Sequence, residues 1–467
     1  MSLMAQEGLK ISAHLVRGRK KIPIDARYNS KYSLLIRSSN VNPFTDGRKF
    51  SRLVIHLNGE DFDLGPCQLI SEPNIDGYDG RLIFLKDVYD LQSLLSDGRT
   101  VKLQKAFVNL PLVLAHKEKI RQSFKGYTAN LTYDLNVYKS FFDKMDAEYS
   151  TEPSDIQHFV QEAIINTEGR KFMRFLDDKL SELEHVVADF SKEEHACHGF
   201  YFRKQLWNII MCSPLMKRTN LKPRGYAGDS EMMRMIYLND YEGESTFSKL
   251  MHKHPSEQPG AHAVRNRRKL ITQTLTNFQS NNPTLPRERL KVLSVASGAA
   301  VEIEDVVVSP EDCEKYHFIL LDQDRAALHE AATLVGQVEK RLGAKIEVDF
   351  LNGSVRTMLA TRQLTERWGQ FDFIYSTGLF DYLTPPVAAA LIGRFYRLLK
   401  VGGEMLIGNF HVLNPSRVYM EYWNDWVIYH RTEEEFMDLL RDAQPAEKSI
   451  SFEDTGCQMF LHVKKAG

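Results

Sequence analysis

The chain lacks the features that mark a disulfide-rich, zinc-binding or membrane-spanning protein. Its five cysteines are scattered singly over 467 residues, and no two of them form a CxxC pair. This spacing indicates neither a zinc site nor a disulfide framework, so we predict no bound metal. No apolar run reaches about 18 residues, the minimum for a membrane-spanning helix, and the amino terminus lacks the apolar core of a signal peptide. We therefore expect a cytoplasmic protein.

An excess of charge of one sign is also missing. The chain has 60 Lys and Arg residues against 61 Asp and Glu residues, which gives a formal net charge of −1. No global field attracts the chain to nucleic acid or to an anionic membrane, so neither is an expected partner. The composition, 43% hydrophobic and 26% charged, is that of an ordinary globular protein. At about 100 to 200 residues per domain, the length predicts about two to four domains.

Glycine-rich phosphate-binding loops are absent as well. The chain contains neither a GxGxxG fingerprint after a strand nor a GxxxxGK[ST] loop. Such loops hold pyrophosphates and triphosphates through backbone N–H groups. The expected ligand is therefore a nucleoside with a non-phosphate tail.

Changes in hydrophobic period divide the chain into three zones. Residues 1–112 carry short β-type runs between turn residues, which predicts a small antiparallel barrel or sandwich. Residues 113–245 have apolar residues three and four apart, which predicts a helical connector or cap. A loop is expected at 252–262. The β-type runs of the first zone are at 32–37, 52–57, 81–85 and 100–108.

The third zone, residues 246–467, alternates strands and helices. This predicts an α/β fold with a doubly wound, mostly parallel seven-stranded sheet, in a Rossmann-like domain. The last two apolar runs, SISFED and MFLHVKK, are separated only by TGCQ, so they predict a terminal antiparallel hairpin. Thr432 and Glu435 are spaced as a capping box that begins the last helix. The runs expected to be strands buried on both faces are KVLSVAS, HFILLD, KIEVDFL, FDFIYSTG and GGEMLIGNF.

A doubly wound sheet binds its ligand beyond the carboxyl ends of its strands, where the strand order reverses. The loop after the first strand, VASGAAVE, contains a single glycine, Gly298. Asp322 ends the second strand, where a carboxylate accepts both hydroxyls of a ribose; a turn or helix cap is the alternative. After the third strand, Gly353 permits close backbone approach, and Ser354 and Val355 are placed to meet an adenine. A simple polar turn is the alternative there.

The segment YSTGLFDYL, after the fourth strand, brings Asp381 and Tyr382 to the mouth of the same cleft. Upstream, PRGYAGD offers Arg224 as a bidentate carboxylate clamp and Tyr226 as a hydrogen-bond donor or a lid. The alternative for this segment is a turn in which Asp229 caps the following helix.

Further polar and aromatic residues have a functional and a structural interpretation. His411 is either a base or a satisfied structural histidine. Arg265, Asn266, Arg267 and Arg268 indicate a solvated helix face, with one arginine available for a salt bridge or an anionic acyl carrier. Four aromatic residues are expected either to line an acceptor pocket or to belong to the core, namely Tyr382, Trp423, Trp426 and Tyr429.

Together these segments resemble the class I S-adenosylmethionine-dependent methyltransferases. The resemblance covers about residues 200–467 and includes the terminal antiparallel hairpin. Ser294, Ala296 and Ala300 stand where that family has an acid and flanking glycines. The closer likeness is to bacterial synthases of 3-hydroxy fatty acid methyl esters, signalling molecules of the extracellular-factor type. Its segments are KPRGYAGDSEMM, AVRNRRKL, LSVASGAAVE, STGLFDYL and EYWNDWVIYHRT.

The resemblance implies S-adenosylmethionine as cofactor and a small acceptor, foremost the carboxylate of a fatty acid or similar apolar acid. The product is then a methyl ester. A carboxylate acceptor is already ionised, whereas a hydroxyl or amine acceptor needs a base. The implied catalytic residues are Arg224, Tyr226, Asp381, Tyr382 and His411. The implied cofactor-binding residues are Ala296, Ser297, Gly298, Glu302, Asp322, Gln323, Gly353, Ser354, Val355, Ser376, Thr377 and Gly378.

The first zone has a fainter resemblance, to PilZ-type barrels that bind cyclic di-GMP. The segments RGRKKIPIDARYNSKYSLLIR and LNGEDFDLGPC carry it, but the D/NxSxxG turn of that family is absent. We interpret the zone as a degenerate barrel for regulation or homodimerisation, with a cyclic dinucleotide as a less favoured ligand. The alternative function for the chain is a nucleotide sensor whose methyltransferase-like domain binds cofactor without turnover.

Overall fold

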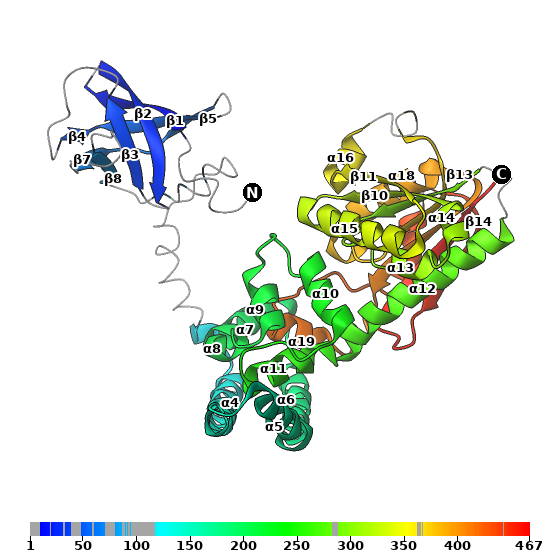
Figure 1. Ribbon diagram of the computed structural model, residues 1–467, viewed down its shortest axis with the longest axis horizontal. Coiled ribbons are helices and arrows are strands. Elements are labelled where there is room, and N and C mark those ends of the chain that lie inside the picture. Colours follow the sequence, from blue (N-terminus) through cyan, green and yellow to red (C-terminus); the bar gives the residue numbers. More distant parts are fainter. Residues whose placement is uncertain are drawn as a thin grey trace. The chain divides into compact units, whose positions relative to one another are not determined.

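The protein, seen in a computed structural model, forms two compact units (Figure 1). The amino-terminal unit is Met1–Lys119 and the carboxy-terminal unit is Ile120–Gly467. The boundary predicted at residue 112 lies outside the described residues, and the division at residue 245 falls inside the second unit and stays a prediction. The described residues are 10–18, 20–30, 33–38, 48–57, 60–70, 80–85, 89, 91, 94, 117–282, 288–361, 366, 368–441 and 443–467.

The amino-terminal unit contains an eight-stranded sheet in the order β4-β7-β8-β3-β2-β1-β5-β6. Every pair of neighbours is antiparallel, which confirms the predicted antiparallel character. In β1 every second residue, Ile11, Ala13 and Leu15, enters one apolar core. The strands are β1 (Lys10–Arg17), β2 (Lys20–Ser30), β3 (Ser33–Ser38), β4 (Lys49–Phe50), β5 (Arg52–Leu57), β6 (Glu60–Asp63), β7 (Cys67–Ile70) and β8 (Gly80–Phe84).

One bent segment connects distant positions of this sheet. Only Ser51 separates β4 from β5, and its N–H donates to the carbonyl oxygen of Val16. The segment therefore pairs with β7 through β4 and with β1 through β5. Closure into a barrel and a PilZ-like identity stay predictions. The strand predicted at 100–108 lies outside the described residues.

The carboxy-terminal unit begins with a set of helices, as the apolar spacing predicts. Phe124, Phe142 and Phe172 enter a core that Tyr422 joins from near the end of the chain. Among the described residues, no helix combines the length and apolar character needed to cross a membrane. The helices are α4 (Gln122–Glu148), α5 (Ser154–Ile164), the π-turn η3 (Ile165–Gly169), α6 (Arg170–Val187), α7 (Lys192–Gln205), α8 (Trp207–Ile210), α9 (Pro214–Leu221), α10 (Ser230–Leu238), α11 (Thr246–Ser256) and α12 (Pro259–Asn281).

The loop predicted at 252–262 is wrong. Helix α11 continues to Ser256 and α12 begins at Pro259, so only two residues separate the two helices. Pro259 occupies the first turn of its helix, where a missing N–H breaks no helical hydrogen bond. Pro255 lies in the last turn of α11 and is buried. The prolines of this segment led to the prediction of a loop, but packing stabilises the helical conformation.

Seven strands form the second sheet, in the order β11-β10-β9-β12-β13-β15-β14. Strands β9 to β13 run parallel, and β15 is antiparallel to both of its neighbours. This confirms the doubly wound sheet and its terminal hairpin. The chain runs from β9 outward to β11 and returns beside β9 as β12, so the order reverses at β9. The strands are β9 (Leu290–Val295), β10 (Tyr316–Asp322), β11 (Glu347–Asn352), β12 (Phe371–Ser376), β13 (Leu399–Phe410), β14 (Pro445–Phe452) and β15 (Gln458–Lys465).

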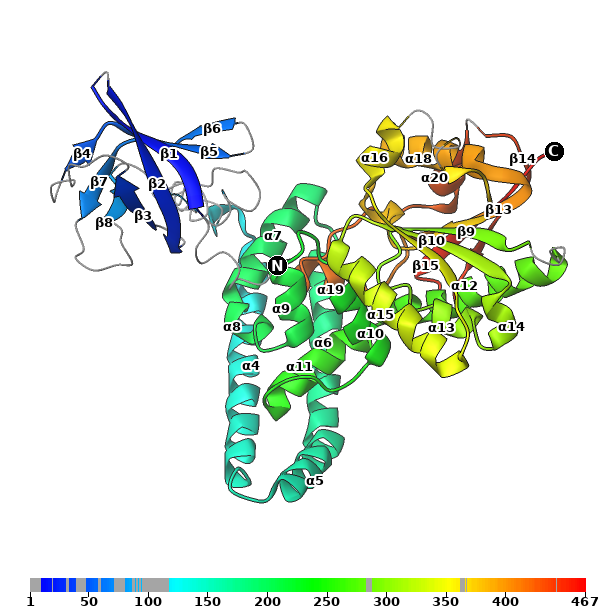
Figure 2. The same cartoon turned by 45° about the horizontal axis from the view of Figure 1, so that its top comes forward.

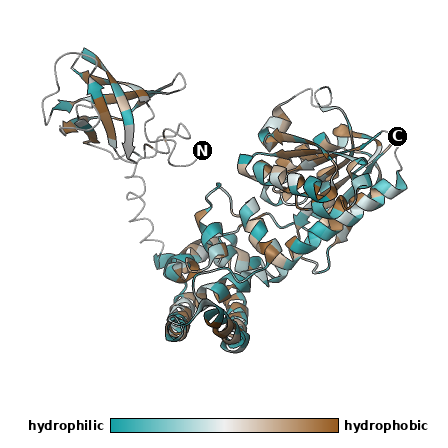
Figure 3. Ribbon diagram, in the orientation of Figure 1, coloured by the Kyte–Doolittle hydropathy of each residue, from teal (hydrophilic) through white to brown (hydrophobic). Residues whose placement is uncertain are grey.

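Helices cover both faces of this sheet (Figure 2). Val292 packs in a core with α12, α13 and α15, whereas its neighbour Leu293 packs in a second core with α18 and α20. Apolar side chains on both faces explain the continuous apolar runs, seen as brown strands in Figure 3. The remaining helices are α13 (Ile303–Val306), α14 (Pro310–Cys313), α15 (Arg325–Leu342), α16 (Val355–Ala360), η4 (Phe380–Tyr382), α18 (Pro385–Leu398), α19 (Arg417–Tyr422), α20 (Glu433–Met437) and η5 (Asp438–Leu440).

Strand β11 departs from the prediction. The run KIEVDFL was expected to be buried on both faces, but Glu347, Asp349 and Phe350 are exposed. The reason is the position of β11 at the end of the sheet order, where β10 is its only partner strand among the described residues. Its place at the edge is decided by the order of the strands and not by its own residues.

Candidate functional site

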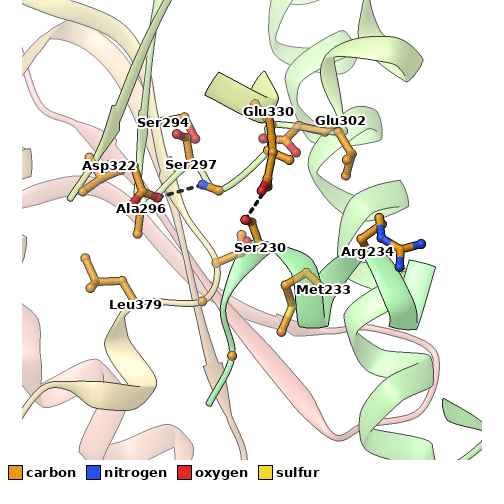
Figure 4. A pocket seen from close by; sticks show the side chains of 18 of the residues that line it. Ser230, Met233, Arg234, Ser294, Ala296, Ser297, Glu302, Asp322, Glu330 and Leu379 are labelled. Carbon is orange, nitrogen blue, oxygen red and sulfur yellow. Dashed lines mark hydrogen bonds between the residues drawn. The ribbon is translucent and has the colours of Figure 1, made fainter. Parts of the chain in front are cut away.

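A cavity of about 640 Å³ lies where the strand order reverses. Loops after β9, β10, β11 and β12 line it from the sheet, and α10 lines it from the helical part of the unit. Figure 4 shows Ser230 and Met233 of α10 around the same space as Ser297 and Asp322 of the sheet loops. A ligand is expected at this place in a doubly wound sheet.

The loop after β9 turns through left-handed backbone conformations. Ala296, Gly298 and Ala300 have φ angles of 55°, 56° and 50°. The two alanines are strained there, because a Cβ crowds the following carbonyl in this conformation. A Cβ added at Gly298 would meet nothing within 4 Å, so the backbone there is open to a ligand. The Oγ of Ser297 is buried and has no partner in the described part of the chain, so a bound polar group would satisfy it.

Asp322 fastens this loop to the end of β10. Its Oδ2 accepts a hydrogen bond from Gly298 N–H (2.9 Å) and its Oδ1 accepts one from Asp324 N–H (2.8 Å). Burial raises the pKa of the Asp322 carboxyl, and the two N–H donors oppose that shift. A carboxylate has about four lone-pair sites, so capacity for further donors remains.

Glu302 and Tyr375 connect the same loop to β12. The Tyr375 hydroxyl donates to Glu302 Oε1 at 2.6 Å, and both side chains line the cavity. Burial raises the pKa of Glu302, and this hydrogen bond opposes the rise. The pair braces the turn, and the resemblance implies in addition a cofactor-binding role for Glu302.

Asp381 lies in η4 after β12 and is one of the residues that line the cavity. The residue is 2% exposed, and its Oδ1 accepts a hydrogen bond from Phe410 N–H at 2.7 Å. Burial raises the pKa of Asp381 to about 7, against the lowering effects of that N–H and of the positive charges of Arg267 and Arg431. Near neutral pH both the protonated and the ionised form of this carboxyl are therefore populated.

Tyr382 presents a hydroxyl whose oxygen already accepts two hydrogen bonds. Trp426 Nε1–H donates to it at 2.7 Å, and Gly228 N–H donates to it as well. Because both neighbours are donors only, the phenolic proton remains available for an acceptor. The ring of Tyr226 meets that of Tyr382 edge-on, 6.4 Å between centroids, and both line the cavity.

Arg224 is held away from the cavity lining by two carboxylates. Its guanidinium donates to Asp324 Oδ2 (2.9 Å), Glu330 Oε1 (2.7 Å) and the Ser230 hydroxyl (2.6 Å). Ser230 also donates to Glu330. These four residues, which we call the polar clasp, join the segment before α10 to α15. Asp229 accepts from Met232 N–H and caps α10, as the alternative interpretation of this segment predicts.

The structure brings most of the predicted site residues to the cavity but leaves three outside its lining. Besides Arg224, these are Ser376 and His411. Ser376 donates to the carbonyl oxygen of Val295 at 2.7 Å and so joins β12 to β9, and His411 contacts Glu433 at 3.0 Å. The predicted residues that do line the cavity are Tyr226, Ala296, Ser297, Gly298, Glu302, Asp322, Gln323, Gly353, Ser354, Val355, Thr377, Gly378, Asp381 and Tyr382.

The prediction of a solvated face at 265–268 is wrong for Arg267, which is 8% exposed and lines the cavity. A signal was present in the sequence. Arg267 shares the three- and four-residue spacing of the buried Val264, Ile271 and Leu275 along α12. A charge in the apolar stripe of a helix indicates either a buried partner or a ligand.

No model of a protein family matches this sequence, and no curated protein matches it. Solved structures do resemble it, at low identity. A possible exported protein from Bordetella parapertussis is 14% identical, with a TM-score of 0.40, over 63% of this chain and 96% of that one. Magnesium protoporphyrin IX methyltransferase from Synechocystis PCC 6803, solved with bound SAH, is 10% identical, with a TM-score of 0.33, over 44% and 87%.

The N-methyltransferase NodS from Bradyrhizobium japonicum WM9 is 14% identical, with a TM-score of 0.30, over 43% of this chain and 97% of that one. At these scores the assignment of the fold rests on the strand order of the chain itself.

Proposed function

We propose that the carboxy-terminal unit binds S-adenosylmethionine in the cavity and transfers its methyl group to a small molecule. The observation that carries this proposal is the strand order, with β15 antiparallel between β13 and β14 and the cavity at the reversal beside β9. This arrangement suits the class I methyltransferases that the sequence resembles. The absence of a phosphate loop suits a nucleoside with an amino-acid tail.

The residues around the cavity fit such a cofactor. The open backbone at Gly298 and the unpartnered Ser297 hydroxyl suit its polar tail, and the spare acceptor capacity of Asp322 suits ribose hydroxyls. Ser354 and Val355 lie beyond β11, where the adenine is proposed. When bound, the cofactor supplies a methyl group on a sulfonium for in-line displacement. The protein's part is to align the acceptor with it and to exclude water.

We further propose that the acceptor is the carboxylate of a fatty acid, with or without a 3-hydroxyl, or a similar apolar acid. Apolar cavity residues support this, namely Met233, Leu379, Phe410 and Trp426. Because a carboxylate is already ionised, it needs only an anchor and partial desolvation. For a hydroxyl or amine acceptor, Asp381 is the group placed to take up the proton.

Calorimetry with S-adenosylhomocysteine tests the cofactor, with ATP as the contrasting ligand. We expect the first to bind and the second not to bind. Incubation with methyl-labelled cofactor and a bacterial lipid extract, followed by mass spectrometry, then tests the acceptor. Label in a polar amine or a protein side chain would contradict the proposal of a methyl ester product. The proposal that the protein is a methyltransferase would still stand.

Cofactor binding without any turnover would favour the alternative function, a sensor with a non-catalytic domain. The replacement of the usual acid and glycines by Ser294, Ala296 and Ala300 is the observation that favours this alternative.

For the amino-terminal unit we propose a regulatory or dimerisation role. The described part of the segment RGRKKIPIDARYNSKYSLLIR includes Arg17, Lys20 and Lys21, which lie together at the β1–β2 hairpin. Calorimetry with cyclic di-GMP and light scattering of the full chain test nucleotide binding and dimerisation separately.

A further inference from the structure

We infer that Arg267 is the carboxylate-binding residue of the cavity. The inference rests on the proposed function and adds to it the group that recognises the anionic part of a ligand. It replaces Arg224, the clamp expected from the sequence, because the guanidinium of Arg224 is already occupied by Asp324 and Glu330.

Arg267 projects from α12 toward the turn that follows β12. Its guanidinium lies 3.4 Å from the Thr377 carbonyl oxygen and 3.1 Å from the sulfur of Met233. A Cβ added at Gly378 would lie 3.4 Å from the same guanidinium, in ordinary van der Waals contact, so the guanidinium lies directly beside this turn. The side chain is thus held between α10 and the sheet, at the wall of the cavity.

The charge of Arg267 has no carboxylate partner among the described residues. A guanidinium has five N–H donors, and here one distant carbonyl and one weakly accepting thioether contact them. A buried cation without a partner anion is costly.

Arg431 provides the contrast, because it is also buried but donates to the Phe380 and Leu383 carbonyls and to the Asn409 side chain. Arg431 does not line the cavity, so its burial has a structural explanation.

Two acids interact with Arg267 through their charge but form no ion pair or hydrogen bond with it in the described part of the chain. Asp381 and Glu302 both interact electrostatically with it, yet each receives its hydrogen bond from another donor, Phe410 N–H and the Tyr375 hydroxyl. Burial raises the pKa of both carboxyls, which favours their uncharged forms. The N–H donors of Arg267 at the cavity wall are therefore not taken up by either acid.

Tyr382 adds a second donor to this wall. Its oxygen already accepts from Trp426 and Gly228, so its proton is available to a ligand. A group with two acceptor oxygens and a negative charge matches an arginine beside a phenol. Two carboxylates fit the proposed function: that of the amino-acid tail of the cofactor and that of an apolar acceptor.

The test uses the full chain with Arg267→Gln and Arg267→Lys. The matched control is Lys269→Gln, which removes the same charge from an exposed position of α12 outside the cavity lining. Each of two ligand pairs has one member with a carboxylate and one without. The first is S-adenosylhomocysteine against 5′-methylthioadenosine, which lacks the whole amino-acid tail, and the second is decanoate against 1-decanol on protein saturated with S-adenosylhomocysteine. Calorimetry gives the affinities, and thermal melting shows that each variant is folded.

We expect Arg267→Gln to lose about 10- to 100-fold in affinity for one carboxylate ligand and nothing for its carboxylate-free partner. Arg267→Lys should lose less affinity for that carboxylate ligand than Arg267→Gln, because lysine keeps the positive charge. Loss confined to S-adenosylhomocysteine assigns the carboxylate to the cofactor, and loss confined to decanoate assigns it to the acceptor. Unchanged affinities, or equal loss for both members of a pair, would overturn the inference. Wild-type protein that does not bind S-adenosylhomocysteine would instead overturn the proposed function.

Discussion

The backbone N–H of Gly298 donates a hydrogen bond to the carboxylate of Asp322 over 2.9 Å, which joins the loop after β9 to the end of β10. The second oxygen of Asp322 accepts from Asp324 N–H in the same way. The acid that is proposed to hold a ribose therefore also shapes the loop that approaches it. The buried side chain of Asp322 thus has a structural role in the loop besides its proposed role in binding.

Replacing Asp322 should affect stability and binding together. Asp322→Ala leaves two N–H groups without their acceptor, so we expect a loss of about 1 to 3 kcal/mol in the free energy of unfolding. Affinity for S-adenosylhomocysteine should fall about 10-fold or more. Asp322→Asn keeps an acceptor oxygen and should lose less stability. Denaturant titration and calorimetry measure the two effects, and unchanged affinity in folded Asp322→Ala would show that the ribose assignment is wrong.

Asp381 should make the protein less stable as the pH rises. Its pKa is raised by burial from 3.8 to about 7, so the folded state binds this proton more tightly than the unfolded state. The contribution of the group to stability is therefore complete below about pH 4 and is lost as the pH rises through about 7.

Asp381→Asn resembles the protonated form, so its free energy of unfolding should vary less with pH over this range. Toward pH 8 its stability should rise relative to that of the wild type. Denaturant titrations between pH 5 and pH 8 measure the difference. Parallel curves for the two proteins would contradict the raised pKa.

Ala296→Gly should stabilise the protein, against the usual effect of glycine. The exposed Ala296 has a φ of 55°, a left-handed conformation that costs an alanine about 1 to 2 kcal/mol. Glycine relieves that cost but lowers the stability by about 0.5 to 1 kcal/mol through the entropy of the unfolded chain, so the net gain in stability should be about 0 to 1.5 kcal/mol. The control is Ala332→Gly on the exposed side of α15, which should lose about 1 kcal/mol. A loss at both positions would mean that the loop is not strained.

Arg224→Gln separates a structural role from a catalytic one. In the polar clasp this guanidinium contacts Ser230, Asp324 and Glu330, so the substitution should lower the free energy of unfolding by about 1 to 3 kcal/mol. Glu330→Gln should lower the free energy of unfolding by a similar amount. The double variant should lose less stability than the two single variants together, because both changes break the same contacts. If Arg224→Gln keeps full stability but raises the KM for the acceptor, the arginine is a substrate clamp after all.

The fold was largely predictable because its signals are local. Apolar runs set the strands, the four residues of TGCQ set the hairpin, and Thr432 with Glu435 did form the predicted capping box. Gly298 and Asp322 were expected at the reversal of the sheet, where they do line the cavity, because strand ends and glycine positions can be read along the chain. Strand β11 was misjudged because its burial depends on which strands lie beside it.

The amino-acid sequence by itself determined the class of the fold, the positions of its strands and the loops that meet at the reversal of the sheet, since each depends on neighbouring residues. Only the tertiary structure decided which arginine side chains reach the cavity. Arg224 forms an ion pair with Glu330, which is 106 residues away along the chain. Arg267 contacts no carboxylate in the described part of the molecule. Such pairings depend on how helices pack on a sheet, and local spacing does not specify that packing.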